Sequence, residues 1–128
     1  MVNHVDYLKY VVKCEKKHGE KTIVLLQVGS FYEVYALKDE SKTYGSKIEE
    51  FSRMNNLEIG EKNITVQGPI EDIVVENKTY HVVMTGISSR RLNDCVDHMI
   101  RQGYTVVTSE VDSQGSFTCC SCKCGNSQ

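Results

Sequence analysis

The chain has 128 residues, of which 40% are hydrophobic and 25% charged, which fits one globular domain and includes no apolar run long enough to cross a bilayer. Its formal net charge of −2 argues against a protein that binds nucleic acid tightly on its own, because such proteins are usually basic. The N-terminal residues lack the basic and apolar regions of a secretion signal, so we expect an intracellular protein that is neither secreted nor bound to a membrane.

The first part of the chain predicts one helix followed by two strands. Asn3 can cap a helix over residues 4–18, because its side-chain oxygen can accept from a free N–H group of the first turn. The apolar runs 22–28 and 31–37 have the composition of strands. Gly29-Ser30 separates them, so they form either a tight hairpin or one long strand that bends at the glycine.

The middle of the chain predicts a short helix and three strands. Ser46 and Glu49 have the spacing of a capping box, which predicts that the helix begins there. Residues 64–67, 70–75 and 80–84 alternate or run apolar, and a turn-like segment follows the second of them. We therefore expect the last two of these strands to form a hairpin.

The last ordered part of the chain predicts a third helix and a final strand. Ser88 or Ser89 can cap the helix, Gly103 ends it, and the strand covers residues 104–111. The order of all these elements predicts an α/β fold, in which helices flank a mixed central β-sheet.

The composition changes after residue 112 to serine, glycine, cysteine and asparagine, which divides the chain into a domain, residues 1–112, and a flexible cysteine-rich tail, residues 113–128. Cys119 and Cys122 have the spacing of a zinc knuckle, but a zinc site normally joins two separated pairs of ligands. We therefore expect no metal and no cofactor, and zinc is the one ion that the spacing leaves open. The four candidate ligands are Cys119, Cys120, Cys122 and Cys124.

The segment Gly29–Val34 is the strongest indication of function. In a strand alternate side chains share a face, so Phe31 and Glu33 point the same way. A phenylalanine can insert between stacked bases and kink a duplex. A glutamate beside it would be repelled by phosphates, so the pair suits contact with a base edge. The alternative is an ordinary half-buried strand, in which Tyr32 and Val34 point inward and Glu33 lies in solvent.

Two motifs of this chain resemble the mismatch-recognition domain of the MutS family of DNA repair proteins. Residues 24–35, VLLQVGSFYEVY, are similar to the Gly-Asp-Phe-Tyr-Glu segment that follows an apolar strand in that family. Met84-Thr85-Gly86-Ile87, with the predicted helix and Gln102-Gly103 after it, is similar to the family's Met-Ala-Gly-Ile-Pro segment, helix and Gln-Gly turn. The resemblance covers about residues 5 to 111, with both motifs in the family's order.

The resemblance implies a fold like MutS domain I and a module that binds mismatched double-stranded DNA in DNA mismatch repair. Phe31 would stack on a mispaired base from the minor groove, and Glu33 would accept a hydrogen bond from that base or donate one. Other MutS domains or a second copy of the chain would be its protein partners. The residues implied as DNA contacts are Gly29, Ser30, Phe31, Glu33, Met84, Arg90 and Arg91.

The chain departs from the family pattern at two places. Ser30 replaces the aspartate before the phenylalanine, a mild change because serine suits the same turn. Ser88-Ser89-Arg90 replaces the Pro-Tyr-His that commonly follows Gly-Ile, and Arg90 can serve there as a cationic replacement.

The sequence predicts a binding module and not an enzyme. It contains no Walker-type phosphate-binding motif, so the ATP binding and hydrolysis of full-length MutS relatives have no counterpart in these residues. Cys95 and His98 lie one helical turn apart, but nothing identifies a third group that would orient them for catalysis. The alternative function is a stand-alone descendant of MutS domain I that acts as a protein-interaction or structural module without ATPase.

Overall fold

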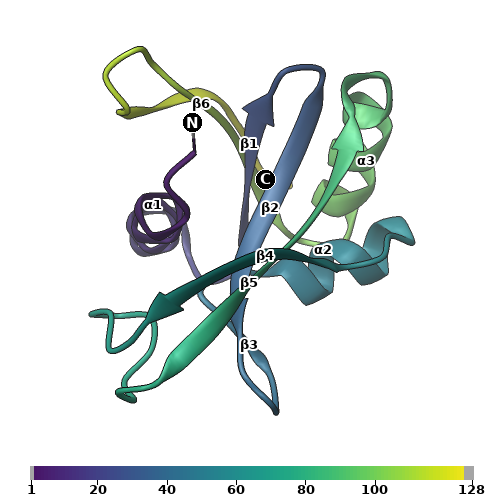
Figure 1. Ribbon diagram of the computed structural model, residues 1–128. Coiled ribbons are helices and arrows are strands. Elements are labelled where there is room, and N and C mark those ends of the chain that lie inside the picture. Colours follow the sequence, from purple (N-terminus) through teal and green to yellow (C-terminus); the bar gives the residue numbers. More distant parts are fainter. Residues whose placement is uncertain (1, 126–128) are drawn as a thin grey trace.

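The computed structural model describes residues 2–125, and these form an α/β protein with a seven-stranded mixed sheet. Figure 1 shows α1 on one side of the sheet and α2 and α3 on the other. The strand order is β4-β5-β2-β1-β6-β7, and β3 pairs with β2 away from this path. Only β1 and β6 are parallel among the named strand pairs of these residues. The predicted class, a mixed sheet flanked by helices, is confirmed.

Helices and strands follow one another along the described residues in a mixed order. The helices are α1 (His4–His18), α2 (Ile48–Asn55) and α3 (Leu92–Arg101), and a 3₁₀ turn, η1 (Ser89–Arg91), precedes α3. The strands are β1 (Thr22–Val28), β2 (Phe31–Lys38), β3 (Thr43–Tyr44), β4 (Gly60–Gln67), β5 (Thr79–Ser88), β6 (Thr105–Val111) and β7 (Phe117–Lys123). No helix in residues 2–125 is long and apolar enough to cross a membrane.

Helix α1 begins and ends as its sequence predicts. Asn3 Oδ1 accepts a hydrogen bond from the Asp6 backbone N–H at 3.0 Å, so the expected cap is confirmed. The helix buries one stripe of side chains against the sheet, which includes Tyr7 and Leu8. The Tyr7 hydroxyl donates to the Val24 carbonyl at 2.7 Å, and this bond fixes the helix to the central strand.

Strand β1 lies in the middle of the sheet and is buried on both faces. Its alternate residues belong to two different cores: Val24 and Leu26 pack against α1, whereas Ile23 and Leu25 pack against α2 and α3. A central strand covered on both sides requires apolar residues at consecutive positions, which explains the unbroken run in the sequence.

The two alternatives for residues 22–37 are resolved in favour of the hairpin. Strands β1 and β2 pair antiparallel, with Val28 opposite Phe31. Gly29 adopts a φ of +61°, the left-handed conformation that a tight turn needs and glycine adopts without strain.

The starts of two helices differ from the sequence prediction. Ser46 does not cap α2: its hydroxyl donates to the Tyr35 carbonyl at 2.6 Å, and Lys47 occupies the cap position without a side-chain hydrogen bond. Likewise, neither candidate serine caps the third helix through its side chain, because the 3₁₀ turn η1 comes first. At α2 a tertiary hydrogen bond occupies the serine side chain, and at α3 a 3₁₀ turn replaces the predicted cap.

The predicted strand over residues 70–75 is wrong. These residues form part of the connection between β4 and β5, with a single bridge between Ile70 and Val74. Their apolar character has another cause, since Val74 is buried and packs in the core beneath α1. The expected hairpin between residues 70–75 and 80–84 is therefore wrong as well, because β5 pairs with β4 instead.

The expectation of a flexible tail is wrong for residues 117–123, which form β7 and pair antiparallel with β6. The Asp112 carboxylate accepts from the Gln114 and Ser116 N–H groups at 2.9 Å and shapes the turn between the strands. Phe117 then stacks on Tyr10 of α1, with ring centroids 5.4 Å apart. Strand β6 is consequently not the final strand. Residues 126–128 of the expected tail lie outside the described residues.

Candidate nucleic-acid interface

The β1–β2 turn projects from one end of the sheet and carries the most exposed aromatic ring of the candidate site. Phe31 is 51% exposed, although it is the first residue of β2 and pairs with Val28 and Ser88 on its two sides. In Figure 1 this turn lies at the top of the sheet, at the same end as the β6–β7 turn. The ring is therefore available for stacking and is not a core side chain.

The fold joins the two motifs that carry the family resemblance. The Ser89 backbone N–H donates to the Ser30 carbonyl at 2.8 Å, so the end of β5 is attached to the β1–β2 turn. The pairing of β2 with β5 also places Glu33 opposite Gly86. Segments more than fifty residues apart in the sequence thus form one surface.

Glu33 lies half-buried on the same face as Phe31 and is held from two sides. The Tyr35 hydroxyl donates a hydrogen bond to Glu33 Oε1. Gly86 leaves space for the carboxylate stem, because a Cβ at this position would lie 3.2 Å from Glu33 Cγ and 2.8 Å from the Tyr32 carbonyl oxygen. The glutamate therefore has a defined position and is not a freely rotating surface side chain.

Two further polar residues surround Tyr35 and were not among the expected site residues. The His4 ring lies edge-on to the Tyr35 ring at 4.7 Å, and Lys62 Nζ lies 5.8 Å from the centre of that ring. Burial, followed by the charge of Lys62, lowers the pKa of His4, and the charge of Glu33 opposes this shift. His4 Nε2 is buried and has no hydrogen-bond partner among residues 2–125.

Of Tyr35, His4 and Lys62, only Tyr35 could have been placed at this site from the sequence. Tyr35 follows Glu33 by two positions in a predicted strand, so its presence on the same face follows from the alternation of side chains. His4 and Lys62 come from α1 and β4, and only the packing of the helix and the register of β4 bring them to Tyr35. Lys62 lies where that register shifts, between Glu61 and Thr65.

The remaining expected contacts are spread over different parts of the surface. Arg90 is exposed in η1, directly after the attachment to the β1–β2 turn. Arg91 instead reaches toward α2, where its Nη2 donates to the Asn55 carbonyl at 3.4 Å. Met84 is half-buried on β5, opposite Tyr35 of β2 and four positions before Ser88, which pairs with Phe31.

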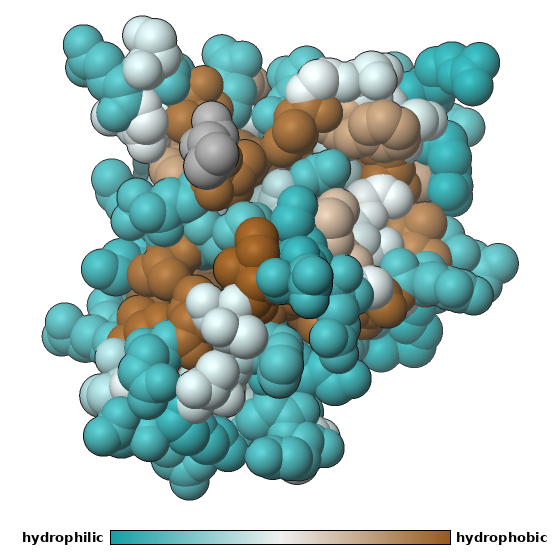
Figure 2. All heavy atoms as spheres, viewed as in Figure 1, coloured by the Kyte–Doolittle hydropathy of each residue, from teal (hydrophilic) through white to brown (hydrophobic). Residues whose placement is uncertain are grey.

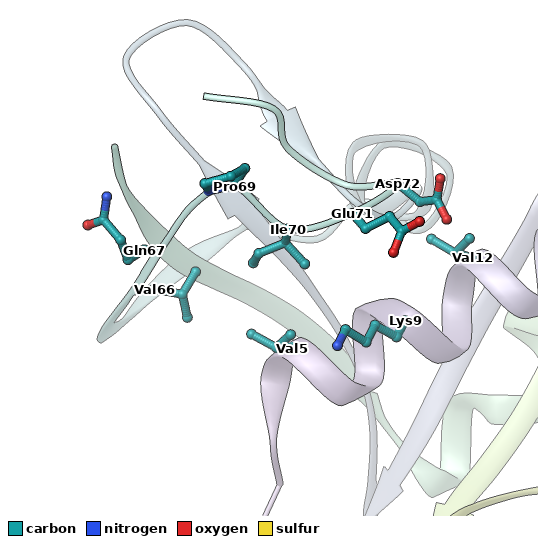
Figure 3. Close-up of a pocket in the computed structure, with 9 residues that line it drawn as sticks. All are labelled: Val5, Lys9, Val12, Val66, Gln67, Pro69, Ile70, Glu71 and Asp72. Atoms are coloured by element: carbon teal, nitrogen blue, oxygen red, sulfur yellow. The ribbon is translucent and has the colours of Figure 1, made fainter. Parts of the chain in front are cut away.

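A separate groove of about 650 Å³ lies between α1 and the β4–β5 connection. Figure 2 shows apolar side chains gathered in this part of the surface, and Figure 3 shows Val5, Lys9 and Val12 of α1 facing the segment Pro69–Asp72 across the groove. The lining is mainly aliphatic, with Lys9 on one wall and two carboxylates on the other. These residues offer a surface for binding and no pairing of a nucleophile with a base.

The candidate zinc ligands lie along β7 and just after it. A bulge in the pairing of β6 with β7 leaves Cys120 unpaired, with Cys119 opposite Ser109 and Cys122 opposite Val107. Cys122 Sγ lies 3.7 Å from His18 Nε2 of α1. An extended strand separates neighbouring thiols, and within residues 2–125 no group of three or more cysteine, histidine or acidic side chains is arranged to hold a metal ion.

Comparison of the sequence with protein-family models and with curated proteins found no match. The resemblance to MutS proteins therefore depends on the two motifs, which the fold joins through the Ser89–Ser30 hydrogen bond. Chemically, the joined surface offers an aromatic ring for stacking, a carboxylate that can accept hydrogen bonds, and nearby cationic side chains from Lys62 and Arg90.

Proposed function

We propose that the chain is a mismatched-DNA-binding module of a MutS-type DNA mismatch repair protein, with a fold like MutS domain I. The observation that carries this proposal is Phe31, a half-exposed aromatic ring at a projecting turn with Glu33 beside it on the same face. An aromatic ring at a tight turn is otherwise expected to be covered by the core, because exposing it forgoes a large hydrophobic contribution.

In this function Phe31 inserts at a mispaired base and stacks on it. Unstacking a base step costs about a few kcal/mol, and the cost is least where pairing is already defective. Selectivity therefore comes from the deformability of the DNA, and Glu33 adds a hydrogen bond to the base that Phe31 contacts. The attachment of Ser89 to Ser30 supports this role, since it holds the turn in place while the ring inserts.

The charge of the chain fits a module that contributes recognition and little general affinity. With a net charge of −2, the chain neutralises few phosphates, so its grip on matched duplex is weak and depends on salt. Strong attachment to the DNA backbone then belongs to partner domains or to a second copy of the chain.

The test is a comparison of Phe31→Ala with the parent chain by fluorescence anisotropy, on matched and mismatched duplexes at low salt. Base–aromatic stacking contributes about 1–3 kcal/mol, so the variant should lose nearly all of the preference for mismatched DNA. Val75→Ala is the matched control, because Val75 is a 90% exposed apolar residue of the β4–β5 connection and should leave the preference unchanged. A mismatch preference that survives Phe31→Ala would show that another surface reads the DNA.

The second candidate is a protein-interaction or structural module. The apolar groove beside α1 and the negative charge favour it, since neither helps to bind DNA. If the parent chain binds no duplex at low salt, the interaction module becomes the better explanation of this fold.

A further inference from the structure

Tyr35 is a buried side chain whose one polar group faces the candidate site. The residue is 1% exposed, and its ring is enclosed by the rings of His4 and Tyr7, at centroid distances of 4.7 Å and 5.2 Å. Lys62 lies over the same ring at 5.8 Å. A ring packed on so many sides has a fixed position, so its hydroxyl group also has a fixed position.

The hydroxyl of Tyr35 is a donor to Glu33. Burial, followed by the hydrogen bond to Glu33, strongly raises the pKa of Tyr35, so the hydroxyl keeps its single proton. That proton is directed at Glu33 Oε1. An ionised carboxylate has two acceptor oxygens, and this bond occupies one of them and leaves Oε2 for another donor.

Gly86 completes the arrangement from the neighbouring strand. Glu33 Cγ would lie 3.2 Å from a Cβ at Gly86, so the stem of the glutamate passes over the glycine. The tip is held by Tyr35 and the stem has its space at Gly86, which restricts the rotamers that Glu33 can adopt. A side chain that is ordered before binding loses less conformational entropy when it makes its contact.

We propose that Tyr35 is a positioning residue, which holds Glu33 so that Oε2 accepts a hydrogen bond from a base with a ring N–H group. This inference depends on the proposed function and adds to it the residue that orients the Glu33 carboxylate. Thymine and guanine present a ring N–H group on their pairing edge, whereas the ring nitrogens of adenine on that edge and in the major groove are acceptors. Tyr35 itself does not touch the DNA and acts through Glu33.

The first experiment measures the contact without DNA, by a double-mutant cycle of Tyr35→Phe and Glu33→Ala in urea unfolding. We expect the two changes to be non-additive by at least about five-fold in the unfolding equilibrium constant, because the bond involves a charged acceptor. Tyr7→Phe is the matched control: it removes another buried hydroxyl next to Tyr35, but that hydroxyl bonds to the Val24 carbonyl. It should be additive with Glu33→Ala. Additive effects of Tyr35→Phe would overturn the inference.

The second experiment compares duplexes with one extra thymine or one extra N3-methylthymine, which lacks the ring N–H group. The parent should bind the thymine duplex roughly ten-fold more tightly, the size expected for a hydrogen bond to a charged group. Tyr35→Phe should reduce this ratio to below about three-fold while Phe31-dependent binding persists, and Tyr7→Phe should retain the parent ratio. A simple loss of stability would weaken binding to both duplexes and leave the ratio unchanged.

The outcomes separate this inference from the function on which it depends. If mismatch binding depends on Phe31 but Tyr35→Phe keeps the parent's preference for thymine over N3-methylthymine, the role of Tyr35 is wrong and the proposed function stands. If the parent binds the thymine and N3-methylthymine duplexes equally and binding still depends on Phe31, only the role of the ring N–H group is wrong. If the parent binds no duplex, the proposed function fails and this inference fails with it, even where the cycle shows coupling.

Discussion

Gly86→Ala tests the close approach of β5 to β2 at the candidate site. A Cβ at Gly86 would lie 2.8 Å from the Tyr32 carbonyl oxygen, 3.2 Å from Glu33 Cγ and 3.3 Å from Glu33 Cα. The carbonyl and the Cα belong to the backbone of a strand that pairs on both sides, so they cannot rotate away. Overpacking of this kind costs about 1–3 kcal/mol, and we expect the variant to be destabilised by about 2 kcal/mol.

Urea unfolding measures this cost directly. The slope for a small domain is about 1–3 kcal/mol per molar urea, so a loss of about 2 kcal/mol lowers the midpoint by about 1 M. Gly60→Ala is the matched control, because Gly60 lies on the neighbouring strand β4 and a Cβ there meets nothing within 4 Å. The control should be neutral or stabilised by about 0.4–1 kcal/mol, since alanine restricts the unfolded chain.

Equal midpoints for Gly86→Ala and Gly60→Ala would refute the reasoning. They would show that β5 can move away from β2 at little cost, and that Gly86 is not needed to give Glu33 its space. A lower midpoint for Gly86→Ala alone would support the close contact, whatever ligand the surface binds.

Two further predictions concern protonation and thiol access. Because the pKa of His4 lies below the ordinary value of about 6.5, the unfolded chain binds a proton more readily, so stability should be complete above about pH 6.5 and decline as the pH falls below it. His4→Phe, which keeps a ring beside Tyr35, should show a smaller fall in the urea midpoint between pH 7.5 and 5.5, and an equal fall would contradict the assignment. Four cysteines (Cys119, Cys120, Cys122 and Cys124) are exposed and should react rapidly with a thiol reagent. Cys14 and Cys95, whose burial also raises their pKa values, should react only on unfolding, and rapid reaction of all six would contradict the packing of α1 and α3.

Elements with a strong local pattern could be predicted from the sequence. Helix α1 has an asparagine cap, a buried stripe and a terminal glycine, and each of these is a local feature. The local sequence could not distinguish a hairpin from a strand bent at Gly29, because both conformations use the same alternation of side chains. Pairing with β5 on one side of β2 and β1 on the other decides it.

Strand β7 shows why the rest could not be predicted. Its residues, FTCCSCK, lack the alternation of apolar and polar side chains that marks a half-buried strand. The strand exists because β6 offers an unpaired edge and because Phe117 packs against Tyr10, and neither partner is adjacent in the sequence. For the same reason, the spacing of the cysteines along the chain did not indicate that Cys119, Cys120 and Cys122 lie in an extended strand.

The exposure of the candidate site follows from the place where α1 begins. Leu37, Tyr35, Glu33 and Phe31 share one face of β2, yet they pass in that order from fully buried to half-exposed. Helix α1 covers the first two, and its first residue, His4, is in contact with the Tyr35 ring. Because the helix starts there, no helix within residues 2–125 covers the sheet face beyond Tyr35, and Glu33 and Phe31 are left for a ligand. One strand thus supplies core residues at one end and a binding surface at the other, and the Asn3 cap marks the boundary between them.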